Sequence, residues 1–158
     1  MKLDASAYAQ ATGGTLVQQG PAGRLWTDSR KVGPGDWFLA IVGVRFDAHD
    51  FLEQLGRTGC AGVIAQRVPD GWPHGFIQVD DTLTALQDVA RFIRSTFTGP
   101  VVGITGSAGK TTTRAMAALA IGELGPVHAT VGNLNNLLKA SSFKNIFPKM
   151  RWILQRSS

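Results

Sequence analysis

Cysteine is almost absent from this sequence of 158 residues, because Cys60 is its only one. A single thiol excludes an intrachain disulfide, and its rarity favours, though weakly, a cytoplasmic protein. No apolar run approaches the roughly 18 residues that a helix needs to cross a bilayer. The N-terminus also lacks the apolar stretch of a signal peptide. The sequence therefore predicts no membrane span.

Acidic residues are missing from residues 137–158, which carry the whole net charge of +5. Residues 1–136 hold eleven Lys and Arg and eleven Asp and Glu, so this part of the chain is neutral. A basic patch on a folded face would support polyanion binding, whereas a basic tail beside a neutral body supports it much less. We therefore expect no nucleic-acid partner.

The chain alternates short apolar runs with segments of helical periodicity. The alternation indicates an α/β fold, and Thr98-Gly99-Pro100 indicates a boundary between two modules. The predicted helices are 4–11, 47–58, 82–97 and 110–124, and the predicted strands are 24–27, 37–42, 61–65, 76–79, 101–105 and 127–130.

A glycine-rich segment, GITGSAGKTTT at residues 103–113, lies between a predicted strand and a predicted helix. Backbone N–H groups of such a loop, with the positive end of the helix, bind phosphates. Lys110 is expected to reach the β- and γ-phosphates and the Thr111 hydroxyl to ligate Mg²⁺. The residues expected to bind ATP are Gly106, Ser107, Ala108, Gly109, Lys110, Thr111 and Thr112.

The loop departs from the usual phosphate-loop consensus in one respect. Its first glycine is Gly103, and Ile104 stands where the consensus has glycine. A dinucleotide fingerprint is the first alternative, but G-x-G-x-x-G is absent. The second alternative is an ordinary glycine-rich turn with a solvated lysine.

Several segments together resemble the Mur ligase family. Besides the loop, residues 28–43 (beginning Asp28-Ser29-Arg30) and residues 46–51 resemble its N-terminal module. Gly132 to Asn136, GNLNN, is most similar to the branch that adds D-alanyl-D-alanine. The resemblance covers about residues 1–137. It implies an α/β substrate module over 1–97, the first part of a P-loop α/β domain over 98–137, and a basic tail without family pattern over 138–158.

The resemblance implies an ATP-dependent amide ligase of peptidoglycan precursor synthesis with ATP and Mg²⁺ as cofactors. Such an enzyme phosphorylates a carboxylate of UDP-N-acetylmuramoyl-tripeptide and joins it to D-alanyl-D-alanine, with Lys110 as a catalytic residue. Asp28 is expected to brace its turn. Each implied contact also has a structural alternative. These are turn hydrogen bonds for Ser29, a solvated charge for Arg30, a packed or capping side chain for His49, and side chains that satisfy the loop backbone for Asn135 and Asn136. The residues implied to contact the substrate are Ser29, Arg30, His49, Asn135 and Asn136.

After Asn136 the sequence departs from the family, and no acidic residue follows that would hold the catalytic Mg²⁺. We therefore expect a truncated or frameshifted fragment that is inactive alone. Two further functions stay open. One is the sister ligase that adds the third residue to UDP-N-acetylmuramoyl-dipeptide, and the other is a non-catalytic module that binds a nucleotide or a UDP-sugar.

Overall fold

The computed structural model describes residues 2–43 and 46–129 of the chain. The chain divides into two compact units, with the change from the first to the second at Thr96 and Phe97. The first unit contains a sheet covered by helices, and the described part of the second contains one helix.

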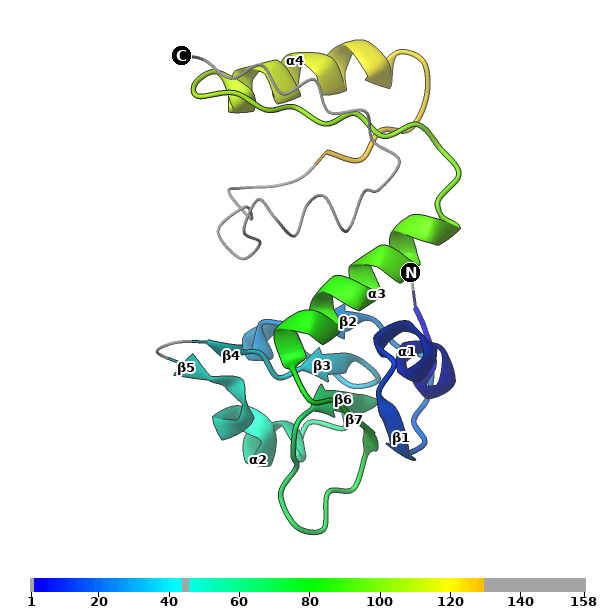
Figure 1. The fold of residues 1–158 in the computed structure, drawn as a ribbon, viewed down its shortest axis with the longest axis vertical. Helices are drawn as coiled ribbons and strands as arrows, with labels where there is room; N and C mark the ends of the chain where they lie inside the picture. The colour runs from blue at the N-terminus through cyan, green and yellow to red at the C-terminus, as the bar shows by residue number, and fades with distance from the viewer. Residues whose placement is uncertain (1, 44–45, 130–158) are drawn as a thin grey trace. The chain divides into compact units, whose positions relative to one another are not determined.

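The first unit is built on a five-stranded sheet with the order β1-β7-β6-β3-β2 (Figure 1). Strand β1 pairs antiparallel with β7, and the other neighbours are parallel. A small antiparallel pair, β4 and β5, follows β3. The strands are β1 (Thr15–Gln18), β2 (Leu25–Trp26), β3 (Trp37–Leu39), β4 (Val42–Gly43), β5 (Phe46–Asp47), β6 (Gly62–Ala65) and β7 (Gly75–Gln78).

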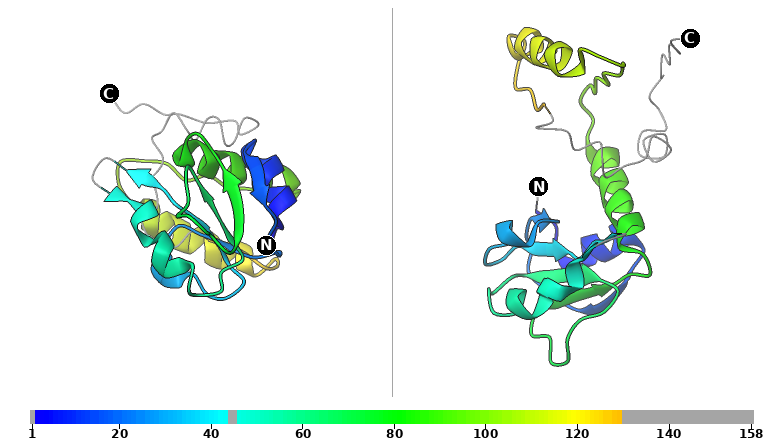
Figure 2. Two further views of the ribbon diagram at one scale, coloured as in Figure 1. Left: turned by 90° about the horizontal axis from the view of Figure 1, so that it is seen from below. Right: turned by 90° about the vertical axis from the view of Figure 1, so that its left-hand side faces the viewer.

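Helices cover both faces of this sheet. Helices α1 (Ala5–Thr12) and α3 (Thr82–Thr96) lie side by side on one face (Figure 2). The short helices η2 (Ala48–Phe51) and α2 (Leu52–Leu55) pack on the other face. A further turn of 3-10 helix, η1 (Ser29–Lys31), follows β2. The first unit therefore has three layers, with helices on both faces of the sheet. This confirms the predicted α/β fold.

Strand β3 shows why the apolar runs form central strands. Trp37 and Leu39 belong to the core under α1 and α3, while Phe38 belongs to the core under α2. All three are buried, because successive side chains point to opposite faces and both faces are covered. Strands that are buried on both sides have no polar face, and their sequence reads as a continuous apolar run.

Trp37 is packed against glycines from three segments of the chain. A Cβ added to Gly20 would lie 2.9 Å from the Trp37 ring, one added to Gly62 would lie 2.6 Å from it, and one added to Gly75 would lie 2.8 Å from it. The indole N–H donates to the carbonyl of Pro21 at 2.8 Å, and the ring centroid lies 5.4 Å from that of Tyr8. The side chain thus fills a space that three missing Cβ atoms leave.

The described part of the second unit contains helix α4 (Lys110–Gly122) and no strand. None of the residues of α4 is buried. Within the described residues, the predicted strand at 101–105 is therefore wrong, and residues 127–129 are not a strand either. A strand exists through hydrogen bonds to a neighbour, and these two apolar segments have no strand partner there. The whole of the loop GNLNN, residues 132–136 with Asn135 and Asn136, lies outside the described residues.

Candidate functional site

The glycine-rich loop has the backbone shape that a phosphate site needs. Gly106 has a φ of 154° and Gly109 a φ of 74°, and residues with a side chain rarely adopt such values. Gly109 is the N-cap of α4, and no side chain caps the helix. The first amides of α4 are therefore available to an anionic ligand, and the helix dipole favours one.

Lys110 folds back over this loop. Its Nζ donates to the carbonyl oxygen of Gly106 at 2.5 Å and to that of Ser107 at 3.4 Å. The ammonium group thus lies above the turn whose amides would hold phosphate, and the whole segment 105–113 is exposed. The loop can therefore receive a phosphate chain with its lysine already within reach, so the residues present fit the triphosphate of ATP.

The described residues offer fewer groups for Mg²⁺ than for phosphate. Thr111 is exposed in the first turn of α4, where its hydroxyl can ligate a metal that is already held by phosphates. Among the residues that the structure describes, no group of three or more His, Cys, Asp or Glu side chains could hold a metal ion. Thr111 is thus a single candidate ligand for a metal ion in the described part of this loop.

In the first unit, Ser29 and Arg30 lie in η1, directly after β2. The Asp28 carboxylate accepts the backbone N–H of Arg30 and pairs with the Arg30 guanidinium through both oxygens, at 2.9 Å each. The Arg30 guanidinium holds the pKa of Asp28 at about 2, below the ordinary 3.8. Asp28 therefore braces the turn, and the Arg30 side chain, 86% exposed, faces solvent.

His49 is buried in η2, with its side chain only 4% exposed. Its Nδ1 lies 2.5 Å from Oδ1 of Asp47, and its Nε2 accepts the backbone N–H of Gln66 at 3.1 Å. Both ring nitrogens are thus engaged inside the protein. This geometry supports the packed role for His49 that the sequence left open beside a substrate contact.

Arg67 is a residue that sequence reasoning missed. It follows β6, and its guanidinium donates to Oδ2 of Asp47 at 2.9 Å. The backbone N–H of His49, its ring and Arg67 together hold the pKa of Asp47 at about 2. Asp47 and Arg67 are twenty residues apart, and only the parallel pairing of β3 and β6 brings their loops together.

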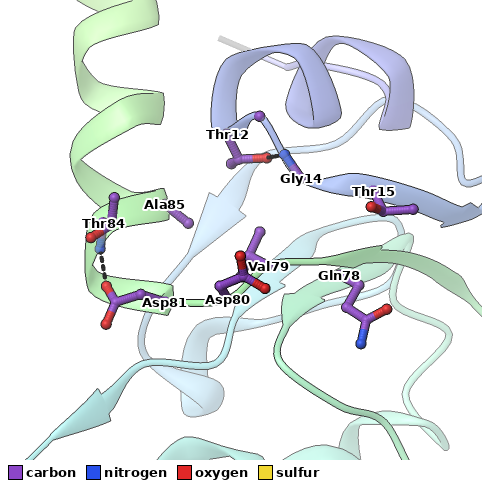
Figure 3. A pocket seen from close by; sticks show the side chains of 10 residues that line it. Thr12, Gly14, Thr15, Gln78, Val79, Asp80, Asp81, Thr84 and Ala85 are labelled. Carbon is purple, nitrogen blue, oxygen red and sulfur yellow. Dashed lines mark hydrogen bonds between the residues drawn. The ribbon is translucent and has the colours of Figure 1, made fainter.

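A hollow of about 210 Å³ lies where α1, β7 and α3 meet (Figure 3). The Asp81 carboxylate in its wall accepts the backbone N–H of Thr84, so it caps α3, and this bond lowers the pKa of Asp81. Gly14 touches β7 so closely that a Cβ there would lie 2.7 Å from the carbonyl oxygen of Gln78. The groups in the hollow therefore serve the fold.

Comparison with curated proteins finds relatives with one common name, UDP-N-acetylmuramoyl-tripeptide–D-alanyl-D-alanine ligase. The protein of Bacillus subtilis is 44% identical over 70% of this chain and 24% of its own length. That of Synechocystis is 42% identical over 71% of this chain and 25% of its own. The chain thus spans about a quarter of the length of these relatives. No family model matches the sequence.

Solved structures agree with this result. The UDP-N-acetylmuramoylalanyl-D-glutamyl-2,6-diaminopimelate–D-alanyl-D-alanyl ligase of Acinetobacter baumannii matches with a TM-score of 0.80 and 37% identity, over 85% of this chain and 31% of that one. MurF ligase from Thermotoga maritima, solved in complex with ADP, matches with a TM-score of 0.64 and 33% identity, over 78% and 29%. No helix of the described residues is long and apolar enough to cross a membrane. By sequence and by fold, the chain matches part of the UDP-N-acetylmuramoyl-tripeptide–D-alanyl-D-alanine ligases, which confirms the likeness to the Mur ligase family that its sequence motifs indicate.

Proposed function

We propose that this chain carries the two nucleotide-binding parts of a ligase that adds D-alanyl-D-alanine to UDP-N-acetylmuramoyl-tripeptide in peptidoglycan precursor synthesis. The second unit binds ATP through the loop of residues 103–113. The first unit, up to Thr96, binds the uridine diphosphate end of the precursor. The single observation that carries the proposal is the loop itself. Its two glycines with positive φ and the uncapped start of α4 form a phosphate cradle within a chain whose relatives are ligases.

In the ATP site, each part of the loop has its own task. The amides of Gly106 to Thr112 would hold phosphate oxygens, and Lys110 would leave the carbonyls of Gly106 and Ser107 to neutralise the β- and γ-phosphates. Thr111 would hold Mg²⁺, which offsets charge on the transferred phosphoryl group when bound. Because phosphoryl transfer depends on position and electrostatics, these residues contribute to the reaction by holding the nucleotide in place.

In the first unit, the loop after β2 is the proposed contact for uridine. Ligands of parallel sheets bind beyond the carboxyl ends of the strands, and Ser29 and Arg30 lie beyond the end of β2. The exposed Arg30 guanidinium is positioned by Asp28 and is suited to a phosphate of the uridine nucleotide. Asn135 and Asn136 remain proposed substrate contacts from the sequence alone.

Removal of the Lys110 ammonium tests the ATP site. A charge-assisted hydrogen bond contributes roughly 1.5–3 kcal/mol, so Lys110→Ala is expected to weaken MgATP binding about ten- to hundredfold. Isothermal titration calorimetry of the full chain measures this. Arg114→Ala, which removes a cation one turn later on α4, is the matched control and is expected to leave the affinity within about twofold. Equal affinities of wild type and Lys110→Ala would exclude the assignment.

A further inference from the structure

A chain of hydrogen bonds connects three loops at the carboxyl edge of the first unit's sheet. Arg67 donates to Asp47, Asp47 pairs with His49, and His49 accepts from the backbone of Gln66. The Gln66 side chain then donates to the carbonyl oxygen of Asp80 at 2.7 Å. The loops after β3, β6 and β7 are thus joined, and the first two are joined twice, through the Arg67–Asp47 pair and through the bond from the Gln66 amide to His49.

The partners of His49 fix its protonation state. The backbone N–H of Gln66 can only donate, so Nε2 must carry a lone pair. The Asp47 carboxylate, whose pKa is about 2, can only accept, so Nδ1 must carry the proton. The contacts are therefore satisfied by one form alone, the neutral imidazole with its proton on Nδ1.

Protonation of Nε2 would break this arrangement at one point. Two hydrogens, one on Nε2 and one on the Gln66 amide, would then face each other, and the Gln66 bond would be lost. The bond to Asp47 would persist, because an imidazolium still donates from Nδ1. The ion pairs at this ring in the described residues join His49 to the Asp47 carboxylate and, beyond it, Asp47 to the Arg67 guanidinium. Asp50 of η2 and Glu53 of α2 are the other acidic groups on the elements next to His49 in the chain.

The segment that His49 ties down lies next to the proposed uridine site. Strand β3 pairs with β2 on one side and β6 on the other. Its carboxyl end leads into β4, β5 and η2, while the end of β2 leads into Ser29 and Arg30. The loops that follow neighbouring parallel strands lie at the same edge. Val32, which ends η1, packs against the same core cluster as Ala48 of η2. Fixing β5 and η2 to the end of β6 therefore also helps to fix the segment that carries Ser29 and Arg30.

We propose that His49 is a positioning residue for the uridine nucleotide. As a neutral imidazole it bonds the β5–η2 segment to the end of β6. On protonation it releases the Gln66 amide, so that the Arg67–Asp47 pair is left to hold these segments and the surroundings of η1 become looser. The proposal rests on the proposed function of the first unit. It adds that nucleotide affinity in this unit depends on the protonation of a residue that does not touch the nucleotide.

The test is calorimetry with UDP-N-acetylglucosamine, whose phosphates are both diesters and do not titrate in the range used. The full chain carries Lys110→Ala so that the loop of the second unit contributes little. Affinity is expected to fall about three- to tenfold between about pH 8 and about pH 5, the change expected for one lost hydrogen bond. His74→Gln combined with His128→Gln is the matched control, because it removes the other histidines of the chain and should leave the fall unchanged.

Two substitutions of His49 distinguish the bond to the Gln66 amide from the bond to Asp47. Glutamine places an amide oxygen near the Nε2 position, so His49→Gln is expected to keep the Gln66 bond and to bind without pH dependence. Asparagine reaches only the Nδ1 position, so His49→Asn is expected to bind weakly at both pH values. A wild type with equal affinity at both pH values, or a His49→Gln variant that keeps the fall, would overturn the proposal.

A ligand-free measurement distinguishes failure of the proposal from failure of the proposed function. Absence of UDP-N-acetylglucosamine binding at either pH would remove the substrate role of the first unit. The positioning role is then judged from hydrogen exchange of the Gln66 amide by NMR, corrected for intrinsic rates. Protection that falls on acidification in wild type, and not in His49→Gln, supports it, and protection that does not change with pH overturns it.

Discussion

Helices α3 and α4 are similar in length and opposite in environment. Helix α3 has fifteen residues and buries Thr82, Ala85 and Val89, whereas α4 has thirteen residues and buries none. The apolar residues of α3 form one stripe, while residues 115–121 of α4, AMAALAI, are apolar all round. An amphipathic helix needs one neighbouring layer, and a helix that is apolar all round needs cover on several sides. Helix α4 thus has the sequence of an interior helix without its cover in the described residues.

The largest expected difference between the two units concerns truncation of a large side chain. Trp37→Ala removes a fully buried indole and should lower the free energy of unfolding by about 3–5 kcal/mol. Leu119→Ala removes a side chain that is 76% exposed and should change it by no more than about 0.5 kcal/mol. Urea denaturation followed by far-ultraviolet circular dichroism measures both. Similar losses for the two variants would mean that α4 is packed in solution.

Replacing a glycine by alanine should lower stability in the first unit and raise it in the second. A Cβ on Gly62 would lie 2.6 Å from the carbonyl oxygen of Gly75, so Gly62→Ala should destabilise the first unit by about 1–3 kcal/mol. A Cβ on Gly122 meets nothing within 4 Å. Gly122→Ala should therefore stabilise α4 by up to about 1 kcal/mol, seen as a larger helical signal and slower amide exchange near Ile121. A destabilising Gly122→Ala would contradict the open surroundings of α4.

The third comparison concerns acid stability, and its effect is smaller than that of truncating Trp37. The pKa of Asp47 is lowered from 3.8 to about 2, so its contribution is present above about pH 4 and is lost as the pH falls toward 2. Asp47→Asn should therefore cost about 1–2 kcal/mol at pH 7, after allowance for partial exposure, and only a small part of that near pH 2. Urea midpoints at both pH values measure this. Asp28→Asn, whose partner Arg30 is exposed, is the control and should cost less.

The sequence predicted those elements whose environment is decided locally or by simple burial. The helical stripe of α3 and the apolar runs of β3, β6 and β7 are of this kind, and all four elements form. Strand β1 was missed because its pattern is mostly exposed and it forms by antiparallel pairing with distant β7. The segment 101–105 was predicted as a strand because its sequence is apolar, but apolarity cannot supply a neighbouring strand.

The candidate sites also differ in how much of each could be predicted from the sequence. The proposed phosphate loop could be recognised in the sequence because its glycines, lysine and helix start are consecutive, and Gly106 and Gly109 have positive φ values in the structure. The Gln66 partner of His49 could not be predicted, because it is a backbone amide seventeen residues away. Every residue type except proline has a backbone N–H, so the residue at position 66 does not indicate this hydrogen bond.

The contact between Trp37 and three glycines has a consequence for sequence variation. Gly20, Gly62 and Gly75 each lack the Cβ that the indole would meet, so the four positions share a single volume. A Cβ at Gly20 would also lie 2.5 Å from the carbonyl oxygen of Ala61, and one at Gly62 2.6 Å from that of Gly75, so a smaller residue at position 37 would not by itself make room for a larger one. In related sequences the three glycines should therefore be retained whatever residue stands at position 37, and a library that varies one of them should recover mostly glycine.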